Sequence, residues 1–225
     1  MLLSTAYFPP LEYIALIARD FTLSPDRVFP SRVTIEACES YVKQSYRNRC
    51  YILTSQGPEM LQVPIVHGEK HISRIRVDYS VPWVEKTKRA IDTAYLSTPW
   101  LEYYRDELYA VLDSQPEHLI DLNTNLLRFL LDKFHIAAEI SFTSEYNKDV
   151  PDDWRSAIHP KKPNTILPSL GLGKPYYQVF HPDTPSSADN TPHSFTQAPQ
   201  GFTPNLSSLD LLLSQGPSSL PWLKK

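Results

Sequence analysis

The sequence has 225 residues, with 22 Lys and Arg against 25 Asp and Glu, so its formal charge at pH 7 is -3. This balance argues against a dedicated duplex-DNA binder, which usually carries a basic excess, and we expect no nucleic-acid partner. A hydrophobic content of 41% argues against wholesale disorder, and the length fits a single domain over residues 1–225. With 21 Pro but only 6 Gly, short elements joined by rigid connections are expected.

The cysteine and histidine pattern predicts no metal site. Cys38 and Cys50 are too far apart for a CxxC pair, and reduced thiols of a cytoplasmic protein are expected. His67 and His71 are four residues apart, but Gly68 indicates a loop there, and no convincing third ligand lies near. No targeting segment and no apolar run of the roughly 20 residues needed for a membrane span is visible. We therefore predict a cytoplasmic protein without a membrane span.

The first 24 residues predict a strand, a helix and a strand. Residues 2–7 are rich in strand formers, Pro9 and Pro10 break this run, and apolar residues then recur at helical spacing over 10–19. Residues 21–24 would form the next strand. This order is typical of a parallel crossover.

Residues 49–78 predict three further strands. Residues 49–53 and 61–66, separated by the turn signal Ser55–Pro58, indicate a hairpin, with Pro64 near a sheet edge or a strand end. Residues 72–78 alternate in part and predict the third strand.

The middle of the chain predicts three helices over 82–96, 99–112 and 119–134, followed by a strand over 138–143. A final helix is expected over 205–215, with Ser207 as N-cap and Asp210 in the position of a capping-box partner. Residues 181–200 have low complexity and few large aliphatics, which predicts a flexible surface loop. The fold class is therefore α/β or α+β, with a mixed sheet, a helical middle portion and a C-terminal helix.

Arg47, Asn48 and Arg49 lead into the first strand of the hairpin. Two guanidiniums and an amide can bind a carboxylate or phosphate, because guanidinium offers a planar fork of donors. Alternation along a strand would put Arg47 and Arg49 on one face. The plain alternative is a solvated strand end.

Two further candidates lie outside this segment. Lys86, in the basic first turns of the helix over 82–96, could contact a phosphate, although such charge runs are ordinary on solvated helix faces. His159 precedes Lys161 and Lys162 in a proline-rich loop, where neighbouring positive charge favours the neutral imidazole that a general base needs. A plain surface loop is its alternative. The chain has no Gly-rich phosphate loop, no nucleophile elbow and no HExxH motif.

Several segments together resemble the WbqC-like family, and their order spans nearly the whole chain. The Asn-Arg strand, the Val-Pro strand and the Pro-Asn-Leu-Ser helix form the most specific combination. The matching residues are Tyr7–Tyr13, Tyr46–Ile52, Gly57, Leu61–Ile65, Trp83, Tyr95, Pro99–Trp100, Tyr177–Phe180 and Gly201–Leu212.

The resemblance implies a bacterial protein from gene clusters for O-antigen and related surface polysaccharides. It also implies amino-acyl, specifically glycine, transfer to a sugar, an activity suggested for some members. Many members carry Gln-Pro where this chain has Thr5-Ala6.

Two hypotheses follow. In the first, the protein is a group transferase for a small anionic or activated-sugar substrate, which Tyr7, Arg47, Asn48, Arg49 and Lys86 bind, with His159 as the catalytic base. In the second, it is a non-catalytic sugar- or protein-binding or assembly module that uses its aromatic surplus as a contact face. The sequence identifies neither a cofactor nor an oligomeric state.

Overall fold

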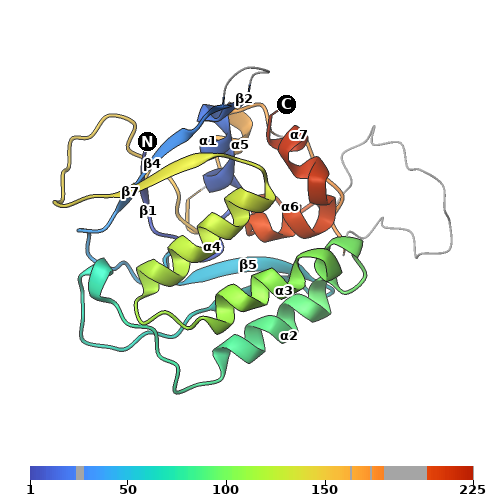
Figure 1. Ribbon diagram of the computed structural model, residues 1–225, viewed down its shortest axis with the longest axis horizontal. Helices are drawn as coiled ribbons and strands as arrows, with labels where there is room; N and C mark the ends of the chain where they lie inside the picture. The colour runs from blue at the N-terminus through green and yellow to red at the C-terminus, as the bar shows by residue number, and fades with distance from the viewer. Residues whose placement is uncertain (24–27, 163, 173, 180–201, 225) are drawn as a thin grey trace.

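The computed structural model describes residues 1–23, 28–162, 164–172, 174–179 and 202–224, and it has the mixed α/β architecture predicted (Figure 1). The predicted loop 181–200 lies outside the described residues. The strands are β1 (Leu2–Ser4), β2 (Thr22–Leu23), β3 (Val28–Phe29), β4 (Ser31–Glu36), β5 (Arg49–Thr54), β6 (Gly57–Gln62) and β7 (Ala138–Phe142). The helices are α1 (Leu11–Asp20), α2 (Trp83–Tyr95), α3 (Pro99–Asp113), α4 (Leu119–Lys133), α5 (Ile166–Ser169), α6 (Ser208–Gln215) and α7 (Ser219–Leu223), with 3-10 turns η1 (Ile72–Arg74) and η2 (Gly216–Ser218).

A three-stranded parallel sheet of order β1-β4-β7 begins the fold. The parallel crossover is present, but its second strand is β4. The prediction that residues 21–24 form it was wrong, because β2 pairs only with β3, in an antiparallel pair. In β4, Ser31, Val33 and Ile35 are buried, and the Ser31 hydroxyl donates to the carbonyl of Ile17 in α1 at 2.6 Å. This alternation fixes which face of β4 packs on the crossover helix.

The hairpin β5-β6 is confirmed, with Thr54 opposite Gly57 at its turn. The predicted bounds 61–66 of its second strand were wrong, because β6 begins directly at Gly57 and ends at Gln62. Gly57 has φ +99°, a conformation that glycine adopts without strain. The predicted third strand over 72–78 was wrong: η1 occupies its first half, and the Ile75 amide donates to the Ile72 carbonyl at 3.3 Å. The buried Ile72 and Ile75 are three residues apart, which is the period of a 3-10 turn and not of a strand.

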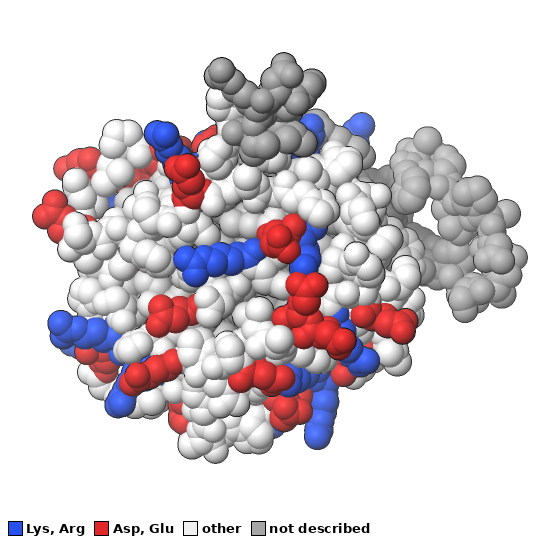
Figure 2. Space-filling model, viewed as in Figure 1, with Lys and Arg blue, Asp and Glu red and all other residues white. Residues whose placement is uncertain are grey.

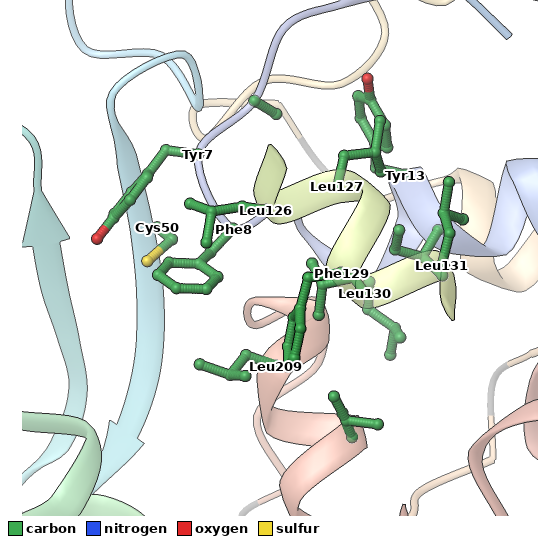
Figure 3. Packing of buried hydrophobic residues seen from close by; sticks show 14 of the residues in the cluster. Tyr7, Phe8, Tyr13, Cys50, Leu126, Leu127, Phe129, Leu130, Leu131 and Leu209 are labelled. Atoms are coloured by element: carbon green, nitrogen blue, oxygen red, sulfur yellow. The ribbon is translucent and has the colours of Figure 1, made fainter. Parts of the chain in front are cut away.

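The helical middle portion is confirmed as α2, α3 and α4. Thr98 caps α3, since its hydroxyl accepts from the Leu101 amide at 3.3 Å, and Pro99 opens the first turn. Helix α4 supplies much of the core and packs beside α1 and α6 (Figure 3). Each fully buried Leu of this kind stabilises the fold by about 1.5–3 kcal/mol. The figure labels Phe8, Tyr13, Leu126, Leu127, Phe129, Leu130, Leu131 and Leu209 in this cluster.

The first turns of α1 and α6 are joined to each other. The Glu12 amide donates to Asn205 Oδ1 at 3.0 Å, and the Leu11 amide donates to the Leu206 carbonyl at 2.9 Å. Asn205 therefore satisfies a free amide of α1 from the far end of the chain. Ser207 caps α6, as predicted, by accepting from the Leu209 amide at 3.2 Å.

The predicted capping box at α6 was wrong. Instead of turning back to Ser207, the Asp210 carboxylate accepts from the hydroxyls of Tyr95 at 2.8 Å and Tyr176 at 2.6 Å, and from Gln178 Nε2 at 3.0 Å. Asp210 is fully buried, and this burial raises its pKa. The network connects α2, α6 and the segment that precedes residue 180.

None of the described helices is long and apolar enough to cross a bilayer. On the face of the molecule in Figure 2, Lys and Arg alternate with Asp and Glu, so this face presents no large field of one sign.

The contact between α1 and α6 gives a first prediction. We expect Asn205→Gly to lower the free energy of unfolding by about 1 kcal/mol, because it removes the cap while still allowing the φ of +57° found at this position. Asn205→Ala should cost more, since it also forces a side chain into that backbone conformation. Urea unfolding measures both. Equal stability of Asn205→Gly and the parent chain would contradict the capping role.

Candidate functional site

A hollow lies at the carboxyl edge of the parallel sheet. Its cavity volume is only about 10 Å³, room for about one water molecule, and it opens to solvent. The residues that follow β1 form one wall, and the segments around residues 46 and 155 form the others. Polar groups placed beyond the ends of parallel strands commonly build ligand sites. Its lining consists of Ser4, Thr5, Ala6, Tyr13, Tyr46, Arg47, Trp154, Arg155 and Ile158.

A buried ion pair holds Arg47 in this wall. Arg47 Nε donates to Glu39 Oε1 at 2.9 Å and Nη2 donates to Oε2 at 2.5 Å, while each residue is only 7% exposed. Arg47 Nη2 also donates to the Ser4 hydroxyl at 3.0 Å. The two-point geometry fits the fork of the guanidinium to the carboxylate. Arg47 is therefore a fixed part of the hollow, and its charge is largely balanced by Glu39.

A second buried pair anchors the opposite wall. Arg155 Nη1 donates to Glu36 Oε2 at 2.5 Å, and Arg155 Nη2 donates to Asp153 Oδ2 at 2.7 Å. Hydrogen bonds from Arg155 lower the pKa of Asp153 and keep it ionised. Because Glu36 ends β4, this pair ties the segment around residue 155 to the carboxyl edge of the sheet.

His159 directly follows the lining residue Ile158. Partial burial lowers its pKa, and the positive charges of Arg47, Lys161 and Lys162 lower it further, so the ring is neutral at pH 7. Its Nδ1 accepts from the Lys161 amide at 3.1 Å. A neutral imidazole that accepts at Nδ1 carries its proton on Nε2. Nε2 of His159 is therefore a hydrogen-bond donor.

Tyr7 lies beside the predicted Arg47–Arg49 segment, because its amide donates to the Tyr46 carbonyl at 2.8 Å. Its ring is fully buried, at 4.8 Å from the ring of Phe8 and 6.3 Å from that of Trp83, and it lies next to Cys50 of β5 (Figure 3). The prediction that residue 7 still belongs to the first strand was wrong, since β1 ends at Ser4. Tyr7 is a core residue next to the hollow and does not line it.

Asn48 and Arg49 also lie behind the hollow. Asn48 Nδ2 donates to the Val63 carbonyl at 2.9 Å, which locks Asn48 between β5 and the end of β6. Arg49 begins β5 and makes no ion pair with any of the described residues. Arg47 precedes the strand. The guanidiniums of Arg47 and Arg49 both lower the pKa of Tyr41, so both lie near its ring. Burial raises the pKa of Tyr41 more strongly than the two charges lower it.

Buried polar atoms without a hydrogen bond gather around this segment. Asn123 of α4 donates to the Arg47 carbonyl at 2.8 Å and to the Thr5 hydroxyl at 3.0 Å, but its Oδ1 has no partner. The Tyr7 hydroxyl lies beside Thr87 without a hydrogen bond of normal geometry. A buried polar group of this kind costs about 1–3 kcal/mol, so it needs an explanation other than stability. The atoms concerned are Tyr7 Oη, Asn48 Oδ1, Arg49 Nε, Trp83 Nε1 and Asn123 Oδ1.

Lys86 does not line the hollow either. It is exposed on α2 and is not among the lining residues. Within the described ranges, no three His, Cys, Asp or Glu side chains gather as metal ligands.

Sequence reasoning missed Glu36, Glu39, Asn123 and Arg155. A signal existed for Asn123, which shares a helix face with Leu119, Leu126 and Leu130, since a polar side chain on a buried helix face usually has a specific partner. For the two Glu–Arg pairs, no local pattern joins the partners.

A family model matches almost all of the residues that line the hollow. The model of the WbqC-like protein family matches residues 5–221 of the chain. The chain belongs to the WbqC-like protein family. No significant match is found among curated proteins or among solved structures. Of the lining residues, only Ser4 lies outside the part that the WbqC-like model matches.

The buried Arg47–Glu39 pair gives a second prediction. Glu39→Leu alone should lower the free energy of unfolding by about 3–5 kcal/mol, because it leaves an uncompensated guanidinium in the core. Adding Arg47→Met should recover most of that loss. Urea unfolding of both single variants and the double variant measures the coupling. Glu139→Gln is the control, since its pair with Arg32 is exposed and should contribute less than about 1 kcal/mol. Additive single losses would contradict a coupled pair.

The Tyr7 hydroxyl gives a third prediction. Tyr7→Phe should leave the free energy of unfolding unchanged or raise it by up to about 1 kcal/mol, because it removes a buried polar group that lacks a partner. Tyr95→Phe is the matched control and should cost about 1.5–3 kcal/mol, since its hydroxyl donates to the Asp210 carboxylate. If both variants lose stability equally, the Tyr7 hydroxyl has an internal partner and no spare hydrogen-bonding capacity.

Proposed function

We propose that this WbqC-like protein is a group transferase whose substrate binds over the mouth of the hollow beyond β1 and extends to the segment of Tyr7, Asn48 and Arg49 behind it. In its specific form, the transferred group is an amino-acyl group such as glycyl, and the acceptor is a sugar of a bacterial surface polysaccharide such as O-antigen. One observation carries the proposal: Tyr7, Asn48, Arg49 and Trp83 each bury a polar atom without a hydrogen bond. All four lie in segments that carry the family resemblance, and a polar ligand would satisfy groups of this kind.

Arg49 is the residue that we assign to the anionic part of the substrate. Its guanidinium has no carboxylate partner in the described part of the chain, whereas Arg47 is occupied by Glu39. Arg47 then acts as a positioning residue, because it fixes the backbone on which Asn48 and Arg49 lie. The Asn48 Oδ1 atom would accept one hydrogen bond from the substrate. Lys86, exposed on α2, could reach only a part of the substrate that extends outside the hollow.

His159 is the proposed acid–base residue. With its proton on Nε2, it first donates a hydrogen bond to the carbonyl or leaving group of the acyl donor. To act as the base, the ring first moves its proton to Nδ1 and releases the Lys161 amide. Nε2 then accepts the proton of the attacking sugar group, and the resulting imidazolium returns a proton to the leaving group of the acyl donor. Its lowered pKa keeps the imidazole neutral, which is the form that a general base needs.

The second candidate, a non-catalytic binding module, is favoured by a different observation. Tyr103 on α3 is 73% exposed, and its ring lies 6.4 Å from that of Trp100 in an edge arrangement. Aromatic side chains of this kind offer contact area to a sugar or a protein at low entropic cost. In that case, substrate would bind at α3 without turnover.

Arg49→Ala separates the two functions. The parent protein is first screened by thermal shift against nucleotide sugars and amino-acyl donors. A bound ligand at 100 times its dissociation constant stabilises by about 2.7 kcal/mol, which raises the melting temperature by roughly 5–10 °C. Arg49→Ala should abolish this shift, and the turnover followed by mass spectrometry of the sugar, while the melting temperature of the free protein stays nearly unchanged.

Arg89→Ala is the control for this experiment, because Arg89 is an exposed arginine on α2 away from the hollow. A ligand shift that Arg49→Ala preserves but Tyr103→Ala abolishes would support the binding module and contradict the transferase site.

A further inference from the structure

Strand β7 is an open edge of the parallel sheet. In the order β1-β4-β7 it has β4 on one side and no described strand on the other (Figure 1). The Ser31 amide donates to the Ala137 carbonyl at 3.0 Å, and the Thr143 amide donates to the Ile35 carbonyl at 3.0 Å. Peptide groups alternate in direction along a strand, so Glu139 and Ser141 also face β4. The amides and carbonyls of residues 138, 140 and 142 therefore point outward.

The sequence of β7 does little to protect this edge. Soluble proteins usually guard an edge strand with lysine, proline, a bulge or a covering loop. Strand β7 reads Ala-Glu-Ile-Ser-Phe, and its only charged residue, Glu139, pairs with Arg32 on the solvent face of the sheet. Phe142 is 45% exposed. An unguarded apolar edge of this kind is a template for another strand.

A groove runs beside this edge, between β7 and α4. Arg128 and Asp132 lie one helical turn apart on its α4 side, and both are exposed. Arg128 forms no ion pair within the described ranges, and Asp132 pairs only with its neighbour Lys133, at 3.0 Å. Leu131, Ile136, Ala138 and Ile140 complete the lining, so the groove combines apolar side chains with opposite charges along one side.

We propose that β7 pairs antiparallel with β7 of a second copy of this chain, about a two-fold axis through Ile140. In this register residue 138 lies opposite residue 142 of the second copy, and every outward amide and carbonyl of residues 138, 140 and 142 gains a partner. The two parallel sheets then form one continuous sheet, with both α4 helices on the same face.

The charges favour a second copy over an unrelated strand. A two-fold axis places the neighbouring α4 helices antiparallel, so Arg128 of each copy faces Asp132 of the other. The same two side chains thus form two reciprocal ion pairs. A parallel addition of strands would not close, because it would leave a new open edge on each added copy.

The first test is sedimentation equilibrium of the full chain over a range of concentrations, together with amide hydrogen exchange resolved by residue. The expected result is a reversible dimer in which the amides of Ile140 and Phe142 exchange more slowly as the concentration rises. A monomer at all concentrations, or a dimer in which these amides gain no protection, would overturn the proposal. In the former case, an unrelated strand is the remaining partner for the edge.

The second test is a charge exchange. Arg128→Asp alone and Asp132→Arg alone should each weaken dimerisation by about tenfold or more, since like charges then face each other across the axis. The double variant Arg128→Asp with Asp132→Arg should restore it. Arg89→Asp, a reversal of an exposed arginine on α2, is the matched control and should leave the dimer unchanged. Circular dichroism confirms that each variant folds. A dimer that is insensitive to both single reversals would place the interface elsewhere.

Discussion

The buried pair of Arg47 and Glu39 is the interaction on which the rest of the site depends. Two charges that are 7% exposed would be strongly destabilising apart, and together they stabilise only because both guanidinium edges find a carboxylate oxygen or a hydroxyl. The pair joins the end of β1, the segment after β4 and the entry to β5. It therefore fixes the path of Tyr46 to Arg49, and through the Tyr46 carbonyl it fixes Tyr7.

Local sequence signals were enough for the parts of the fold with strong periods and clear ends. Helices α2, α3 and α4 repeat their apolar residues at helical spacing, so their positions followed directly. Pro82 before α2, and Thr98 and Pro99 at the start of α3, also mark where those two helices begin. Strand β4 was not predicted although Ser31, Val33 and Ile35 alternate, because residues 21–24 already supplied a second strand for the crossover. Residues 72–78 were misassigned because Ile75 and Val77 alternate as in a strand, whereas Ile72 and Ile75 have the three-residue spacing of a 3-10 turn.

The candidate site was predictable only where its members are close in sequence. Arg47, Asn48 and Arg49 are adjacent in the sequence. Tyr7 was assigned to the same site because its segment also carries the family resemblance. The partners that determine what these residues can do come from far away. Arg155 and Glu36 are 119 positions apart, and Asn123 reaches the Arg47 carbonyl across 76 positions. The sequence analysis expected the guanidiniums of Arg47 and Arg49 to be free. It did not predict that Glu39, only eight residues from Arg47, pairs with Arg47. Nothing in the local pattern pairs them.

The contrast between Asp210 and Tyr7 bears on function. Elsewhere the fold supplies hydrogen bonds to a buried polar group. The fully buried carboxylate of Asp210 accepts hydrogen bonds from two tyrosine hydroxyls and a glutamine amide. The same fold leaves polar atoms of Tyr7, Asn48, Arg49 and Trp83 without hydrogen bonds, all in segments that carry the family resemblance. A phenylalanine at position 7 would fill the same space without that cost. Selection for stability alone would therefore remove the hydroxyl, and this is the physical argument behind the ligand contact proposed for Tyr7.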